Sequence, residues 1–153
     1  MSDHRLASVE LDARTLPAAS AEIEHERRVA VFDLVEKNVF QPVGAATGPF
    51  ALKLSSQDGK LAFDISGPDF ARVHGVSMSP LNKVIKDYID ICDSYYEALR
   101  GADASKIEAV DMGRRGLHNE GAEVVQQRLS GKVEVDQETA RRLFTLITAL
   151  YRR

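Results

Sequence analysis

The sequence contains no tryptophan and only one cysteine, Cys92, among its 153 residues. A single cysteine excludes an intramolecular disulfide and a metal cluster held by several thiolates. It is also typical of a reducing compartment. The first residues lack the basic region and apolar run of a secretory signal, so we expect a cytoplasmic protein.

Long hydrophobic runs are absent as well. The longest stretch without a charged residue runs from Asn38 to Leu52, and its 15 residues include two prolines and two glycines. A helix that spans a bilayer needs about 20 apolar residues. We therefore expect no membrane partner.

Neither sign of charge is in large excess, since 20 Lys and Arg residues against 23 Asp and Glu residues give a net charge of −3. Domains that bind nucleic acid are usually basic, so we expect no nucleic-acid partner. With 44% hydrophobic and 28% charged residues, the composition is that of a globular protein. The length predicts a single domain over residues 1–153.

Strand patterns dominate the first half of the chain and helix patterns the second. Asp58-Gly59 lies between two alternating apolar and polar runs, which is a strong signal for a β-hairpin. The Gly- and Pro-containing segment 41–49 is predicted to be a loop. Alternation predicts strands over residues 6–11, 50–55, 60–66, 72–77 and 132–135.

Helices are predicted from apolar residues at helical spacing and from residues that favour helix starts. The expected caps are Ser20, Ser79 with Pro80 after it, a capping box from Ser105 to Glu108, and Asp136. The predicted helices cover residues 21–38, 80–100, 105–129 and 137–151. Together these elements predict an α+β fold, with a small antiparallel sheet built on a central β-hairpin and covered by about four helices.

The least ordinary stretch of the chain is residues 111–121, with the sequence DMGRRGLHNEG. On a helical wheel Asp111, Arg114 and His118 fall along one edge of the apolar stripe. Asp111 and Arg114 are three residues apart, and Arg114 and His118 are four apart, so each pair can meet. Buried charges are costly unless they are paired, so we expect Arg114 and His118 to be shielded and at least one of them to contact a carboxylate.

Two interpretations of this cluster stay open. It can be a structural network that fixes the packing of the helix. It can also be a ligand site for an anionic small molecule, with residues drawn from Asp111, Arg114, Arg115, His118, Asn119 and Glu120. The run also contains three glycines (Gly113, Gly116 and Gly121), which indicate a kink, a close helix approach or a backbone that contacts a ligand.

Other candidate residues favour structural roles. Cys92 lies on the apolar face of its helix, so we expect it to be buried and slow to alkylate. His25 lies among glutamates and lacks the second histidine of a zinc-protease helix, which favours a solvated acidic surface. The sequence predicts no metal site and points to no particular cofactor.

Several long motifs resemble an uncharacterised family of small alphaproteobacterial proteins of unknown function. The resemblance covers about residues 6–150 and is carried chiefly by ICDSYY at 91–96, DMGRRGLHNEG at 111–121 and TARRLFTLI at 139–147. It implies a bacterial cytosolic setting and no catalytic role. We therefore favour a non-enzymatic binding or regulatory module, with a homo-oligomer or a protein partner. The alternative is a small enzyme or ligand-binding protein for an anionic metabolite that uses Arg114, Arg115 and His118.

Overall fold

The computed structural model describes residues 3–152 and shows an α+β fold, as the sequence predicts. Four helices and six strands follow one another within these residues. Their bounds are β1 (Leu6–Leu11), α1 (Ala21–Glu36), β2 (Phe40–Pro42), β3 (Phe50–Gln57), β4 (Lys60–Gly67), β5 (Phe70–Ser77), α2 (Ser79–Gly101), α3 (Ala104–Leu129), β6 (Val133–Val135) and α4 (Gln137–Tyr151).

The main sheet has four strands in the order β1-β3-β4-β5. The hairpin of β3 and β4 is confirmed, and Asp58 and Gly59 at its turn both adopt positive φ, as a tight hairpin turn requires. β5 continues the antiparallel meander. β1 instead pairs in parallel with β3, so the sheet is mixed. A parallel neighbour needs a long crossover, and α1 lies in that connection.

A second, two-stranded sheet joins distant parts of the chain. β2 pairs antiparallel with β6, with Phe40 opposite Val135. The prediction of a strand near residue 133 is confirmed, whereas residues 41 and 42 belong to a strand and not to the predicted loop. The pairing partner of β2 lies about ninety residues away, which no local turn signal can reveal.

All four helices start within one residue of the predicted positions, and two of the four predicted capping residues are confirmed. Ser20 and Asp136 cap α1 and α4, and their side chains accept the backbone N–H groups of Ile23 and Thr139. The predictions of a Ser79 cap and a Ser105 capping box were wrong. Met78 precedes α2 without a side-chain cap, and Asp103 caps α3 by accepting the N–H of Lys106. The Asp103 carboxylate lies two residues before Ser105 and accepts the free N–H at the start of the helix in place of the Ser105 hydroxyl.

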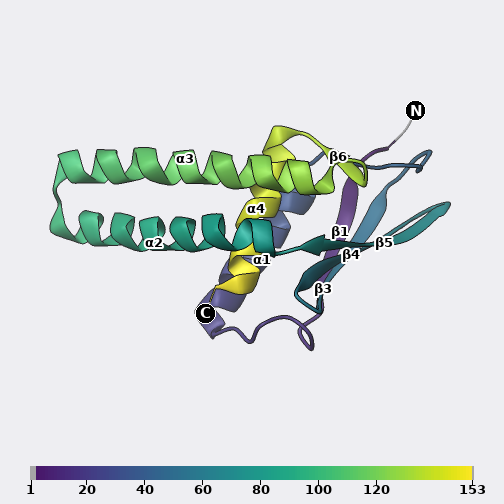
Figure 1. The fold of residues 1–153 in the computed structure, drawn as a ribbon, viewed down its shortest axis with the longest axis horizontal. Coiled ribbons are helices and arrows are strands. Elements are labelled where there is room, and N and C mark those ends of the chain that lie inside the picture. Colours follow the sequence, from purple (N-terminus) through teal and green to yellow (C-terminus); the bar gives the residue numbers. More distant parts are fainter. Residues whose placement is uncertain (1–2, 153) are drawn as a thin grey trace.

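The arrangement of layers is plain in Figure 1. The main sheet lies at one end, α1 and α4 pack against each other in the middle, and the α2–α3 hairpin projects away from the sheet. Buried residues from the sheet and from all four helices form one hydrophobic cluster, which includes Phe63, Leu81, Val125 and Phe144. Within residues 3–152, no helix combines the length and the apolarity that crossing a bilayer would need.

α3 runs unbroken through its three glycines, two of which lie close to a side chain of another helix. A side-chain carbon at Gly121 would collide with the ring of Phe144, and one at Gly113 would meet the end of Ile91. A side-chain carbon at Gly116 would meet open space. Of the interpretations offered by the sequence, close helix approach is therefore correct for Gly121 and Gly113.

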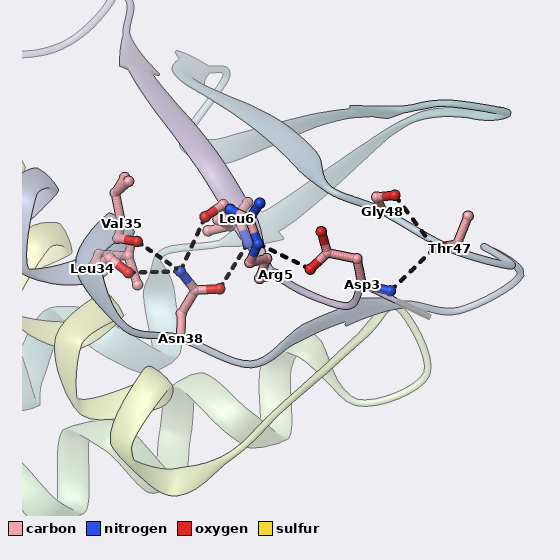
Figure 2. A network of polar contacts seen from close by, with 8 residues as sticks. All are labelled: Asp3, Arg5, Leu6, Leu34, Val35, Asn38, Thr47 and Gly48. Carbon is pink, nitrogen blue, oxygen red and sulfur yellow. Dashed lines mark hydrogen bonds and ion pairs between the residues drawn. The ribbon is translucent and has the colours of Figure 1, made fainter. Parts of the chain in front are cut away.

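Two polar side chains, at the middle and just beyond the end of α1, form hydrogen bonds with the backbone of other segments. Arg27 is buried and donates to the carbonyl oxygens of Ala149 (3.1 Å), Leu150 (2.9 Å) and Pro17 (2.9 Å). Asn38, just beyond the end of α1, donates to Leu34 O and exchanges two hydrogen bonds with the backbone of Leu6 (Figure 2). The helix ends at Glu36, two residues before the predicted end, which frees Asn38 for this role.

Candidate functional site

Three of the predicted site residues form an ion-pair network on α3. Asp111 Oδ1 accepts from Arg114 Nη2 at 2.6 Å, and Asp111 Oδ2 lies 2.7 Å from Arg115 Nη2. The hydrogen bond from Arg114 is the main reason why the pKa of Asp111 is lowered from its ordinary value. The prediction that Arg114 meets Asp111 is confirmed, since the helical spacing of three residues brings the groups side by side.

The Arg114 side chain is also held from the other helix of the hairpin. Its guanidinium lies over the ring of Tyr95 on α2, 5.3 Å from the ring centre. The side chain is 33% exposed, while that of Arg115 is 64% exposed. Arg114 is thus shielded on two sides, whereas Arg115 faces solvent.

His118 points toward α4 and not toward Arg114. Its Nε2 lies 2.8 Å from the hydroxyl of Thr145, and that hydroxyl donates to the carbonyl of Arg141 at 3.1 Å. The hydroxyl proton is therefore used, so Nε2 must carry the imidazole hydrogen. The other ring nitrogen, Nδ1, is then an acceptor, and it is buried without a partner.

The surroundings of His118 keep it neutral. Its ring lies against Tyr88 and Phe144, with ring centres 5.4 and 5.6 Å apart. Burial, followed by the charges of Arg141 and Arg114, lowers its pKa to about 4. At neutral pH this imidazole offers a hydrogen bond and no positive charge.

The last two predicted site residues lie apart from the ion-pair network. Asn119 accepts a hydrogen bond from Arg141 on α4. Glu120 is exposed and forms no ion pair within residues 3–152. The structure therefore brings together Asp111, Arg114 and Arg115, joins His118 and Asn119 to α4, and leaves Glu120 at the surface.

A groove of about 290 Å³ opens beside this cluster, between α1, α2 and α4. Arg114 and His118 do not line it, but Tyr88 and Thr145, which adjoin His118, do. Its lining also includes His25, Glu26, Val29, Ala30, Asp33, Cys92, Thr148, Ala149 and Arg152. Sequence reasoning missed this groove because its three walls come from segments far apart in the chain.

Thr148 is the most unusual residue of the groove. Its residue surface is only 7% exposed, and its hydroxyl is buried without a hydrogen-bond partner. A buried hydroxyl normally finds a partner, since leaving it unpaired costs about 1–3 kcal/mol. The hydroxyl has almost no accessible surface, so a molecule in the groove could pair with it only after the side chain turned toward the groove.

Cys92 lies in the same groove and is half-buried, so the prediction of a buried cysteine overstated its burial. The thiol still occupies a largely apolar place, and burial raises its pKa. Burial likewise raises the pKa of Tyr88. At neutral pH both groups keep their protons.

An ion-pair network at the end of α4 borders the groove. Arg152 lies 3.5 Å from Glu26 on α1 and 3.2 Å from Asp93 on α2. Asp33, also on the rim, is exposed and forms no ion pair in the described chain. The rim thus keeps one unpaired carboxylate.

These features define a small α+β protein with a groove between three helices and a paired arginine cluster beside it. The model of the family described as "Uncharacterised protein family (UPF0262)" matches residues 3–153, and the chain belongs to this family. This confirms the resemblance to an uncharacterised alphaproteobacterial family.

Relatives of similar length share about half of its residues. A UPF0262 protein of Caulobacter vibrioides is 54% identical over 150 residues, covering 98% of this chain and 94% of the relative. One from Phenylobacterium zucineum is 53% identical over 148 residues, covering 97% and 93%. One from Rhodopseudomonas palustris is 53% identical over 152 residues, covering 98% and 93%. No solved structure matches this chain.

Proposed function

We propose that this chain is a non-enzymatic binding module of the bacterial cytoplasm, and that the groove between α1, α2 and α4 holds a small molecule. The observation that carries the proposal is the buried, unpartnered hydroxyl of Thr148 at the groove. Buried polar groups normally have a partner, and the Thr148 hydroxyl is the one at the groove among five buried side-chain polar atoms of residues 3–152 that lack one.

The groups around the groove support binding more than catalysis. Cys92 and Tyr88 keep their protons, so neither is an activated nucleophile or base. The Nε2 hydrogen of His118 is bonded to Thr145, which fixes the ring. The Cys92 thiol and the Tyr88 hydroxyl interact by a hydrogen bond, but both keep their protons, so they do not form the pair of nucleophile and base that covalent catalysis needs.

The lining also suggests the chemistry of the ligand. Val29, Ala30 and Ala149 offer apolar contact, and the Thr148 hydroxyl offers one hydrogen bond. The unpaired carboxylate of Asp33 on the rim favours a neutral or cationic molecule over an anion. We therefore expect a small, largely apolar ligand with one polar or amine group.

The alternative is an anionic metabolite held by Arg114, Arg115 and His118, and it has weaker support. Asp111 already occupies both guanidinium groups, so an anion would have to compete with a carboxylate that is fixed in place. His118 adds no positive charge near neutral pH. The exposed side of Arg115 is the feature that still favours this reading.

Three aromatic probes of nearly equal size separate these readings. Benzyl alcohol, benzylamine and benzoate differ in charge, and a thermal-shift titration measures the binding of each. We expect benzylamine and benzyl alcohol to raise the melting temperature and benzoate to have little effect. Stabilisation by benzoate alone, abolished by Arg115→Ala, would instead support the anion site.

Two threonine variants of α4 test the place of binding. Thr148→Val removes the unpartnered hydroxyl at constant shape, so stability should stay the same or rise while binding weakens about tenfold. Thr139→Val is the control, because that buried hydroxyl accepts the N–H of Val39 at 2.8 Å and lies outside the groove. It should lower stability and leave binding unchanged. Equal binding by wild type and Thr148→Val would refute the proposed site.

A further inference from the structure

The outer edge of β1 is a second surface that the fold leaves open. β1 ends the sheet, and its one neighbour within the described chain is β3. Asp12 donates its backbone N–H to Leu54 O at 2.9 Å, toward β3. Backbone groups of a strand alternate in direction, so the N–H and C=O of Leu11 and Val9 point away from β3.

The open edge has a definite limit at each end. At one end, the Asn38 side chain takes the place of a neighbouring strand, because it accepts the Leu6 N–H (2.7 Å) and donates to the Leu6 carbonyl (3.2 Å) (Figure 2). At the other end β1 finishes at Leu11, and in the turn that follows the carbonyl of Asp12 accepts the N–H groups of Thr15 and Leu16. The free stretch is therefore residues 7–11, and its midpoint is Val9.

An apolar groove of about 490 Å³ runs along this free stretch, between β1 and α1. Val9 and Leu11 line one side, and Val31, Phe32 and Val35 line the other. Phe32 is 66% exposed, the most exposed of the large hydrophobic side chains in the described chain. Lysine and proline often protect the exposed edges of monomeric sheets, and residues 6–11 contain neither, although a register shift between Leu6 and Ser8 interrupts the regular pairing at the start of β1.

We propose that β1 pairs antiparallel with β1 of a second copy of this chain, with Val9 at the centre. Such pairing would let the two Val9 residues exchange N–H···O=C bonds and would use the whole free stretch of both copies. Glu10 would lie opposite Ser8 of the partner subunit, so like charges would not face each other. Because the edge of β1 is complementary to itself, a second copy of the chain in a symmetric dimer is a better partner for it than an unrelated strand.

The arrangement of the two copies in this dimer also accounts for the exposure of Phe32. The twofold axis of an antiparallel strand pair is perpendicular to the sheet, so both α1 helices would lie on the same face. The two apolar grooves would then face each other across the joined strands, and each Phe32 would be removed from water. The result is a continuous eight-stranded sheet, formed from two four-stranded sheets.

Sedimentation equilibrium over a concentration series tests the proposal with the full chain. We expect a species of twice the 16.9 kDa chain mass, which dissociates on dilution. Phe32→Glu should weaken the dimer at least tenfold, and its circular dichroism should match that of the wild type because Phe32 is exposed. Val73→Glu is the control, because Val73 is 58% exposed on the opposite edge strand β5 and should not affect association.

A second variant tests the strand pairing itself. Val9→Pro removes an N–H that points away from β3, so the contacts of β1 with β3 stay while the central bond of the dimer is lost. We expect this variant to be a folded monomer. A wild type that stays monomeric throughout would overturn the proposal, even if it bound an added extended peptide at this edge. A dimer that survives Phe32→Glu and Val9→Pro, or that is lost in Val73→Glu, would overturn it as well.

Discussion

The ring of Phe144 on α4 lies directly against the backbone of Gly121 on α3, so closely that no side chain fits between them. Gly121→Ala should therefore destabilise the protein by about 2 kcal/mol, since overpacking a rigid core outweighs the gain in helix propensity. Gly116→Ala, five residues earlier in the same helix, meets open space and should stabilise by up to about 1 kcal/mol. Urea denaturation of both variants measures the difference, and equal effects would show that α3 and α4 are not in close contact at Gly121.

Arg27 should be the most important charged side chain for stability. Its guanidinium is buried and satisfies carbonyl groups at the C-terminal end of α4 and in the segment before α1. Arg27→Ala leaves these acceptors unpaired and should cost about 3 kcal/mol. Arg28→Ala, at the exposed neighbouring position, should change stability by less than about 0.5 kcal/mol. Comparable losses in the two variants would contradict this account of α1.

The ion pair between Arg114 and Asp111 should contribute less than a fully buried pair. The Arg114 side chain is 33% exposed, so solvent screens the pair, although the Tyr95 ring adds a cation–π contact. We expect Arg114→Ala to cost about 1–2 kcal/mol in chemical denaturation, and Arg115→Ala less than about 0.5 kcal/mol. A variant Arg114→Ala as stable as the wild type would favour a ligand site at this cluster over a structural network.

His118 should make the protein less stable in weak acid. Its pKa is about 4 when folded and near 6.5 when unfolded, so between these values the unfolded state binds the proton and the folded state does not. Stability is thus complete above pH 6.5 and falls as the pH drops toward 4. After allowance for solvent screening of a partly exposed ring, the loss is about 1–2 kcal/mol.

The variant His118→Gln is the matched control for this pH dependence. Its amide can still donate to Thr145, and it does not titrate. The difference in unfolding free energy between wild type and variant isolates His118 from the other histidines, including His74, whose pKa is also lowered, mainly by burial. If the difference in unfolding free energy between wild type and His118→Gln stayed constant from pH 7 to pH 4, His118 would not be shielded from solvent.

Much of the local structure could be predicted because its causes are local. The Asp58-Gly59 turn determines the β3–β4 hairpin, and Asp136 determines the start of α4, within a few residues. The ion pair of Asp111 with Arg114 follows from the spacing of one helix. Where two local signals compete, as at Asp103 and Ser105, a pattern alone cannot decide between them.

What could not be predicted depends on contacts between distant segments. The parallel pairing of β1 with β3 and the joining of β2 to β6 are set by how the helices pack. His118 lies near Arg114 on the helical wheel, yet it bonds to Thr145 because α4 crosses α3 there. The groove at Thr148 has walls from three helices, so no single motif contains its signal.

The most direct test of the binding proposal is a titration of the ¹⁵N-labelled protein with benzylamine, followed by two-dimensional NMR. We expect saturable shifts that cluster at the groove, above all at Val29, Cys92 and Thr148, and that weaken about tenfold in Thr148→Val. Shifts that cluster instead around Arg115, or a spectrum that does not change, would contradict the proposal that this groove is the binding site.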